Sequence, residues 1–212
     1  MKIVSVIARK GGTGKSTCCR SLAVEGLKAG QRTVILDGDP QASTLRWAER
    51  RKARGIEVPI VASLSADMPI SALLSHYDQR GVNLLLIDTP PVLTPIINRA
   101  LEYSTGIVVV VRPNPEDLES VADTLKLAAV YRRPQGVVLW QVSPDKRVRA
   151  TALAREFLTS AGAGTAPTAV AASVVYPYAY AQGMTVQELE PASRARTEIA
   201  AVWGWLQEQS IV

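Results

Sequence analysis

A glycine-rich segment near the N-terminus, residues 10–17 (KGGTGKST), carries the residue types that bind phosphate. Glycines in such a turn let successive backbone N–H groups curl around phosphate oxygens, and the dipole of a following helix adds positive potential. Lys15 would reach the β- and γ-phosphates of a nucleotide, and the Ser16 hydroxyl would coordinate Mg²⁺. We therefore predict a nucleotide site with contacts from Gly11, Gly12, Thr13, Gly14, Lys15, Ser16 and Thr17.

Aspartates close two other apolar runs. Asp37 ends the run at residues 32–37 and is followed by Asp39, and Asp88 follows the run at residues 82–87. An open parallel sheet places its ligand crevice at the carboxyl ends of its strands. Alternation along a strand puts Asp37 and Asp39 on the same side, as a shared metal and water site requires. One aspartate after an apolar run is a weak signal, but three motifs in this order, each at a strand end, indicate one site.

Short β-branched runs alternate with longer helix-like segments along the 212 residues, which is the pattern of a parallel sheet with crossover helices. The centres of the runs are fully apolar, as expected for strands covered on both faces. No linker, low-complexity stretch or repeat divides the sequence, so we predict a single domain, residues 1–212, with an α/β, doubly wound, mostly parallel fold. The predicted strands are residues 2–8, 32–37, 58–62, 82–88, 106–112, 136–142 and, as the weakest candidate, 166–173.

Several segments between and after these strands have helical signals. Residues 16–29 are followed by a glycine, and residues 116–131 carry acidic residues in the first turn and are followed by two arginines, which suits the helix dipole. We expect Pro191 to open the last helix, whose apolar side chains recur at helical spacing. The segment 176–183, which contains a proline, is predicted to be a loop or a broken helix.

The phosphate loop departs from the strict pattern G-x-x-x-x-G-K-[ST], because Arg9 stands where its first glycine should be. The loop resembles the deviant form of the ParA/MinD family of P-loop ATPases. The closest match in size and layout is to the small plasmid-partition ParA proteins, which lack an N-terminal helix-turn-helix domain.

In that family the extra lysine, here Lys10, reaches across a face-to-face dimer to the partner's nucleotide. The resemblance thus implies ATP and Mg²⁺ as cofactors, a homodimer in the ATP state, and catalytic roles for Lys10 and Lys15. The alternative is a surface lysine beside an ordinary phosphate loop.

Two further motifs carry the same resemblance. Residues 37–41 (DGDPQ) look like the family's switch I motif, which implies that Asp39 is a catalytic residue that positions the attacking water. Residues 84–91 (LLLIDTPP) resemble its Walker B strand and switch II. By this resemblance Asp37 and Asp88 lie near Mg²⁺ and hold it through water, so the implied metal residues are Ser16, Asp37 and Asp88.

The resemblance continues into the second half of the chain, where fewer residues match the family's motifs. Residues 108–118 resemble the family's strand-to-helix passage, and residues 176–188 resemble its late Y-x-x-A-x-x-x-G-x-x-V-x-E segment. Several relatives place an arginine shortly before the late tyrosine, whereas this chain has serine and valines at residues 173–175. The adenine-side contacts that the family would place at residues 141–145 and 173–178 therefore stay unassigned.

The net charge of +5 is concentrated in the first half of the chain, where residues 46–54 hold five basic residues against one acidic residue. Such a balance permits binding to nucleic-acid phosphates, and a dimer would double every patch. The resemblance to the ParA branch implies DNA binding without sequence preference, although each run is also explained as a solvated helix face. We favour residues 46–54. The candidate DNA contacts are Arg46, Arg50, Arg51, Lys52, Arg54, Lys146, Arg147, Arg149, Arg194 and Arg196.

Other features argue against membrane or cluster chemistry. No apolar run approaches the roughly 20 residues that cross a bilayer, and residues 197–212 carry glutamates but no Lys or Arg, unlike the lipid-binding helix of the MinD branch. Cys18 and Cys19 are adjacent, which suits neither a disulfide nor a metal clamp, so we expect packing residues. Trp205 lies off the apolar stripe of the last helix and is a candidate for an exposed partner contact. His76 is given no role.

The preferred hypothesis is a partition or positioning ATPase. ATP would close a sandwich dimer, the dimer would bind non-specific DNA, and a ParB-like or cargo-adaptor protein would stimulate an otherwise weak hydrolysis of ATP. No leader precedes the first apolar run, so we expect a cytoplasmic, nucleoid-associated protein. Two alternatives are a membrane-surface regulator like MinD, which the C-terminus disfavours, and an ATP-dependent synthetase or small-molecule kinase, for which we find no substrate-binding constellation.

Overall fold

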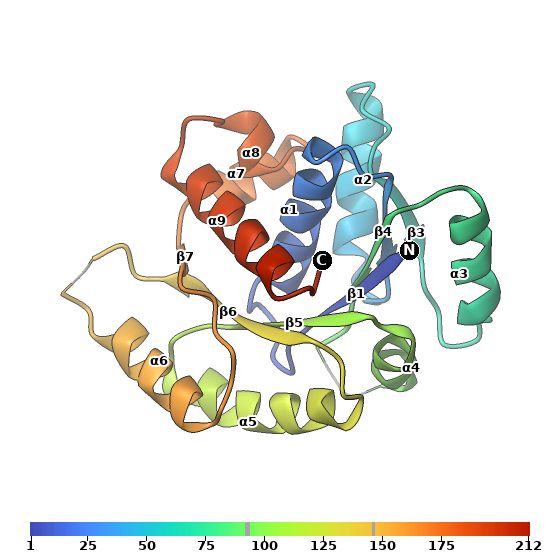
Figure 1. Cartoon of the computed structure of the whole chain (residues 1–212). Helices are drawn as coiled ribbons and strands as arrows, with labels where there is room; N and C mark the ends of the chain where they lie inside the picture. The colour runs from blue at the N-terminus through green and yellow to red at the C-terminus, as the bar shows by residue number, and fades with distance from the viewer. Residues whose placement is uncertain (92–93, 146) are drawn as a thin grey trace.

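The computed structural model describes residues 1–91, 94–145 and 147–212. Over these residues it contains a seven-stranded sheet in the order β3-β2-β4-β1-β5-β6-β7, in which every neighbouring pair of strands is parallel (Figure 1). The α/β, doubly wound class predicted from the sequence is confirmed. The strands are β1 (Lys2–Ile7), β2 (Thr33–Asp37), β3 (Ile60–Ser63), β4 (Leu84–Asp88), β5 (Gly106–Val111), β6 (Gln135–Val142) and β7 (Val170–Ala171).

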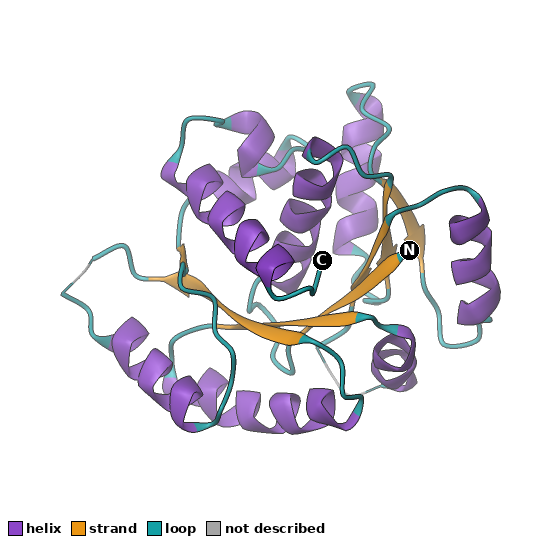
Figure 2. Ribbon diagram, viewed as in Figure 1, coloured by secondary structure: helices purple, strands orange, loops and turns teal. Residues whose placement is uncertain are grey.

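Helices cover both faces of the sheet (Figure 2). One face packs against α1, α2, α7, α8 and α9, and the other against α3, α4, α5 and α6. Among the described residues, no helix combines the length and the apolar character that a bilayer-spanning segment needs. The helices are α1 (Lys15–Lys28), α2 (Ser43–Ala53), α3 (Ile70–Gln79), α4 (Pro95–Tyr103), α5 (Pro115–Val130), α6 (Ala150–Ser160), α7 (Val175–Ala181), α8 (Val186–Leu189) and α9 (Arg194–Glu208).

The central strands bury both of their faces, which explains their continuous apolar sequences. In β4, Leu84 and Leu86 pack on the side of α1, whereas Leu85 and Ile87 pack on the side of α3. Each of these side chains is fully buried, and burial of one such side chain stabilises the fold by roughly 1.5–3 kcal/mol. The sheet is therefore anchored from both sides, and its strand ends are held in fixed register.

That register brings the carboxyl ends of three strands together. Asp37, the last residue of β2, pairs in register with Asp88, the last residue of β4, and Asp88 also stands opposite Val6 of β1. The glycine-rich loop begins just after β1 ends. One edge of the sheet therefore carries the phosphate loop and both aspartates, as the sequence predicts.

The helices predicted at residues 16–29 and 116–131 are present and begin and end one residue earlier, as α1 and α5. The prediction for Pro191 was wrong, because α9 starts later, at Arg194. The Ser193 hydroxyl caps α9 by accepting the backbone N–H of Arg196 at 3.2 Å, and serine satisfies a free helical N–H as proline cannot.

The segment 176–183 was predicted to be a loop or a broken helix, but most of it is helix α7. Pro177 is the third residue of α7, where its missing N–H has no intrahelical partner to lose. The weakest predicted strand, residues 166–173, is reduced to the two residues of β7.

Trp205 is not an exposed partner contact. Its indole is half-buried, packs against the core on the α1 side and lies directly over Gly136 of β6. A Cβ at residue 136 would approach the indole ring to 2.7 Å, so glycine is required there for the helix to dock. Cys18 and Cys19 are buried free thiols in the same core, as expected of packing residues.

Arg51 was predicted among the DNA contacts, and the structure contradicts this. Its side chain is 2 % exposed and forms two hydrogen bonds to Glu188, both of 2.8 Å, and three more to the carbonyls of Val58 and Gly183. The helical repeat that contains the exposed Lys52 and Arg54 does not predict the burial of Arg51. Two of its partners, Gly183 and Glu188, lie 132 and 137 residues away. Arg51 joins α2 to the turn that precedes α8.

We predict that Arg51→Ala lowers the free energy of unfolding by about 3 kcal/mol, because it leaves a largely buried carboxylate and two carbonyls without their donor. Urea unfolding followed by circular dichroism measures this. The neighbouring exposed substitution Lys52→Ala is the control and should stay within about 0.5 kcal/mol of the native protein. Equal stabilities for the two variants would show that Arg51 does not hold the fold.

Candidate functional site

Backbone geometry explains the glycines of the phosphate loop. Gly12 and Gly14 have φ of +73° and +97°, which residues with a Cβ rarely adopt. Gly14 also caps α1, and any Cβ there would collide with the ring of Trp140 in β6. At Gly11 and Gly12 a Cβ would meet nothing within 4 Å, so the loop faces open space at these residues. The loop is thus shaped as a concave strip of backbone at the start of a helix, which suits an anion.

Lys15, the first residue of α1, lies under this loop and is 6 % exposed. Its Nζ donates to the carbonyl oxygen of Lys10 at 3.2 Å, and the Thr13 hydroxyl donates to the same oxygen at 3.4 Å. Burial lowers the pKa of Lys15, while the carboxylates of Asp88 and Asp39 act against that shift. The ammonium group is therefore held inside the loop, beside the aspartates of the strand ends.

Asp37 holds the start of α2 through its carboxylate. Its Oδ2 accepts the backbone N–H groups of Thr44 and Leu45 at 3.0 and 2.9 Å, and its Oδ1 accepts that of Asp39 at 3.1 Å. The residue at the N-cap position, Ala42, has no side-chain oxygen, so Asp37 supplies the acceptor that the helix start needs. Burial raises the pKa of Asp37, and these hydrogen bonds oppose the rise.

Asp88 is fully buried, and its two carboxylate oxygens differ in their hydrogen bonding. Oδ2 accepts the hydroxyl of Thr44 at 2.7 Å, whereas Oδ1 is buried and has no hydrogen-bond partner among the described residues. Burial, followed by repulsion from Asp37, raises the pKa of Asp88 to about 6. The hydrogen bond from Thr44 opposes the rise. An unpartnered carboxylate oxygen next to a hydroxyl is a donor set that suits Mg²⁺, an ion usually bound by one or two carboxylates together with phosphates.

A cavity of about 650 Å³ opens beside the loop. Loop residues and Asp39 form one side, and the opposite side is built from β6, the segment after β7, and α7. Sequence reasoning assigned no role in the site to the residues of this opposite side or to Arg20 of α1, which also lines the cavity. The residues of the opposite side include Trp140, Gln141, Ser173, Tyr176 and Tyr180.

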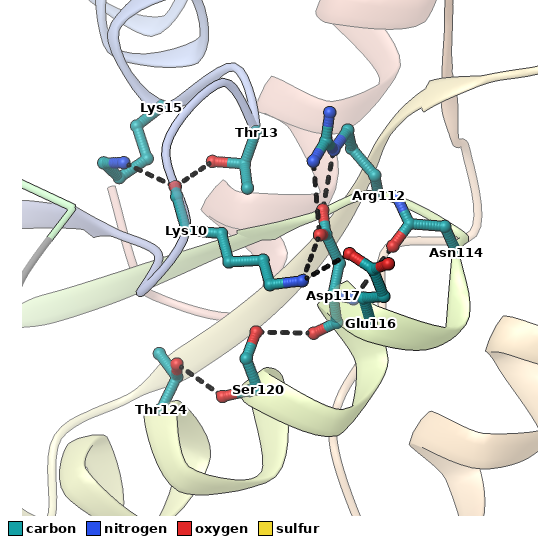
Figure 3. A network of polar contacts seen from close by, with 9 residues as sticks. All are labelled: Lys10, Thr13, Lys15, Arg112, Asn114, Glu116, Asp117, Ser120 and Thr124. Atoms are coloured by element: carbon teal, nitrogen blue, oxygen red, sulfur yellow. Dashed lines mark hydrogen bonds and ion pairs between the residues drawn. The ribbon is translucent and has the colours of Figure 1, made fainter.

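Lys10 points away from Lys15 and toward α5 (Figure 3). Its Nζ lies 3.1 Å from Glu116 Oε2 and 3.5 Å from Asp117 Oδ1. Asp117 is buried and also accepts the Arg112 guanidinium at 2.7 Å. Burial alone would raise the pKa of Asp117, but Arg112 and Lys10 outweigh it and hold that pKa below its usual value. The ammonium group of Lys10 therefore forms ion pairs with α5 of the same chain and lies outside the cavity that Lys15 enters.

Arg9 occupies the position where the strict pattern has glycine and contacts α5 as well. Its guanidinium forms an ion pair with Asp123 at 2.7 Å. The start of the loop is thus attached to α5 twice, through Arg9 and through Lys10.

The structure separates the predicted DNA contacts into different surfaces. On α2, Arg46, Lys52 and Arg54 are exposed and Arg50 is half-buried. Arg147 is exposed but forms an ion pair with Asp145 at 2.8 Å, and Lys146 lies outside the described residues. Arg149 and Arg196 are exposed, while Arg194 pairs with Glu198 at 2.6 Å. With Arg51 removed, α2 still presents the largest group of basic residues.

A family model for the CobQ/CobB/MinD/ParA nucleotide binding domain matches residues 4–173, which include the phosphate loop, both aspartates and the far wall as far as Ser173. The chain belongs to this family. The predicted resemblance to ParA/MinD ATPases is thereby confirmed, and the domain type is one that binds nucleotide.

Individual relatives agree with this assignment. "Maintenance of carboxysome distribution protein A" of Gloeobacter kilaueensis is 31 % identical over 148 residues, covering 68 % of this chain and 64 % of the relative. Protein ParA of Rhizobium radiobacter is 29 % identical over 155 residues, covering 69 % and 68 %. The chain thus spans about two thirds of the length of these relatives.

Among solved structures, the septum site-determining protein MinD of Pyrococcus horikoshii, complexed with Mg-ADP, superposes with a TM-score of 0.78 at 16 % identity. The match covers 99 % of this chain and 97 % of that one. At this identity the likeness establishes the fold.

We predict that Asp88→Asn stabilises the metal-free protein in a pH-dependent way. The pKa of Asp88 is raised from 3.8 to about 6, so the protonated form favours folding, and its contribution is lost as pH rises from about 4 to about 6. The advantage of Asn over Asp should therefore grow from near zero at pH 4 to at most about 3 kcal/mol at pH 7. Urea unfolding in EDTA across this range measures it.

Asp39→Asn is the matched control, because Asp39 lies at the half-exposed rim of the same cavity. Its effect on stability should be small. If Asp88→Asn changed stability equally at pH 4 and pH 7, the buried carboxylate would not be the titrating group.

Proposed function

We propose that this protein is a nucleotide-dependent positioning ATPase, which closes into a homodimer around ATP, binds DNA without sequence preference in that state and is released after hydrolysis. The observation that carries the proposal is the placement of Lys10. Its ammonium lies against Glu116 at 3.1 Å and points out of the cavity that Lys15 enters, so it does not serve its own nucleotide and would exchange Glu116 for the phosphates of a second chain.

The phosphate-binding role rests on the loop. Backbone N–H groups at Gly11, Gly12 and Gly14 would bind phosphate oxygens, and Lys15 would neutralise the β- and γ-phosphates. The unpartnered Oδ1 of Asp88 and the Ser16 hydroxyl would hold Mg²⁺, which supplies positive charge to the phosphates when bound. Asp37, whose oxygens already accept three backbone N–H groups, would act on the metal side through water and by fixing α2.

Asp39 would position the attacking water. It lines the cavity opposite the far wall, and its Oδ1 accepts the backbone N–H of Gln41 at 2.9 Å, which fixes the direction of the carboxylate. Lys10 from the partner chain would add a positive charge at the transferred phosphoryl group, as an arginine finger does in other phosphate-loop enzymes. Hydrolysis by one chain alone would then be weak.

DNA is proposed as the surface on which the dimer acts, because basic side chains on α2 are exposed and a dimer doubles them. The name of the Gloeobacter kilaueensis relative, which concerns carboxysome distribution, fits a protein that places cargo. A ParB-like or cargo-adaptor protein that stimulates hydrolysis, and a cytoplasmic, nucleoid-associated location, complete the proposal.

The dimer switch is tested by measuring mass with light scattering in ADP and in a non-hydrolysable ATP analogue. We expect a monomer with ADP and a dimer with the analogue. Lys10→Ala should remain a monomer in both while it binds nucleotide within about threefold of the native affinity, since Lys10 serves the other chain. Lys126→Ala, an exposed lysine of α5, is the control and should dimerise normally. A native protein that is monomeric in both nucleotides contradicts the switch.

DNA binding is tested with random-sequence duplex at a series of salt concentrations. We expect binding with the ATP analogue, weaker binding with ADP, and a steep loss of affinity with salt because phosphate neutralisation releases counterions. Lys15→Ala should abolish the effect of nucleotide. Lack of DNA binding by the native protein at low salt with the analogue would refute this part of the proposal.

A further inference from the structure

Three arginine side chains and two aromatic rings form an alternating stack that runs from the buried side of α2 to its exposed face. The order is Arg51, Trp47, Arg20, Tyr180 and Arg50. Arg51 lies 4.6 Å from the centroid of the Trp47 ring, and Arg20 lies 5.9 Å from the same centroid. Arg20 also lies 4.9 Å from the centroid of the Tyr180 ring, against which Arg50 lies at 4.6 Å. Each contact falls within the range of cation–π attraction, about 6 Å from the ring centroid.

The middle of this stack borders the nucleotide cavity. Arg20 is 6 % exposed and lines the cavity together with Tyr180. Its guanidinium donates to the hydroxyl of Thr17, next to the phosphate loop, at 3.1 Å and to that of Thr44 at 3.3 Å. Thr44 in turn donates to Asp88 at 2.7 Å. Arg20 therefore contacts both the phosphate side and the metal side of the site.

The outer end of the stack reaches the basic face of α2. Arg50 and Arg46 both lie beside the side chain of Tyr180. Burial alone would raise the pKa of Tyr180, but the positive charges of these arginines outweigh it and hold the pKa below its ordinary value. Arg50 also donates to the backbone carbonyl of Arg46, one turn earlier on α2, at 3.3 Å, so its guanidinium is directed toward Arg46.

Both ends of the stack resist independent movement. Arg51 is fixed by its bidentate pair with Glu188, and the Trp47 indole donates to the carbonyl of Met184 at 3.0 Å. Arg20 is buried, and its charge faces Asp88 and Asp37. A shift of Arg20 would therefore be passed through the Tyr180 ring to Arg50, because close-packed groups do not deform separately.

We propose that Tyr180 and Arg20 are positioning residues that hold Arg46 and Arg50 as a phosphate-binding pair on the face of α2 and tie that pair to the occupancy of the nucleotide cavity. The partner that fits this face is the phosphodiester backbone of DNA, so the inference rests on the proposed function and deepens it. Guanidinium groups suit it because they stack on rings and bind phosphate oxygens with two parallel donors.

The link is tested first without DNA, by hydrogen–deuterium exchange at saturating nucleotide. In the native protein, the ATP analogue should protect α2 (Ser43–Ala53) as well as the phosphate loop. Tyr180→Leu keeps apolar bulk but removes the ring, so the loop should still be protected while protection of α2 is lost. Tyr178→Leu, on the same helix but 60 % exposed, is the matched control and should behave as the native protein.

The second measurement is reciprocal binding. Coupling between two sites commonly amounts to about 5- to 150-fold, and it must be equal in both directions. We expect the ATP analogue to tighten DNA binding by at least about 10-fold in the native protein, and DNA to tighten nucleotide binding by the same factor. Both factors should fall to within about twofold of unity in Tyr180→Leu, since the ring carries the link.

Tyr180→Phe separates the two parts of the inference and guards against a folding defect. The ring remains, so coupling between nucleotide and DNA should persist. The contacts from Arg46 and Arg50 to the hydroxyl are lost, so DNA affinity should fall severalfold in every nucleotide state.

The outcomes distinguish this inference from the function on which it rests. Lack of DNA binding by the native protein refutes the proposed function, and the exchange experiment then decides whether the cavity and α2 are linked. Absence of α2 protection in the native protein, or equal protection in Tyr180→Leu, overturns the inference even if DNA binds.

Discussion

The arrangement of the site depends on two carboxylates that lie side by side at one buried edge of the sheet. Asp37 and Asp88 are partners in register on neighbouring strands, and both are almost inaccessible to water. Burial and, after it, repulsion from Asp37 disfavour a charge on Asp88, as its raised pKa reflects. The surrounding groups offset this cost by donating hydrogen bonds or positive charge, and these groups are the phosphate loop, the start of α2 and Arg20.

The same interaction makes α2 sensitive to the state of the site. Asp37 holds the first N–H groups of α2, and Thr44, in its first turn, donates to Asp88. A cation bound at Asp88 would compete with the hydrogen bonds that the start of α2 now donates to the two carboxylates. Because Arg51 attaches the far end of α2 to Glu188, the helix is held at both ends by charged groups.

The phosphate loop differs from the strict pattern in a way that its contacts explain. Arg9 and Lys10 both reach α5, through Asp123 and Glu116, so the loop begins with two ion pairs, of which a glycine at residue 9 would remove the first. This arrangement keeps the charge of Lys10 apart from Lys15 although the two residues are only five positions apart. One loop therefore carries two lysines with different surroundings.

Local sequence determined the phosphate loop, the alternation of strands and helices that the fold confirms, and the aspartates at strand ends, because each depends on neighbouring residues, on alternation and on φ angles that only glycine adopts freely. The burial of Arg51 beside the exposed Lys52, the ring of Trp140 over Gly14, and the contact of Arg20 with Tyr180 were decided only by the tertiary structure. Their partners lie more than a hundred residues away, and a helical repeat cannot distinguish a solvated arginine from one that meets a carboxylate in the core. Packing of α7 and α8 against α2 makes that difference.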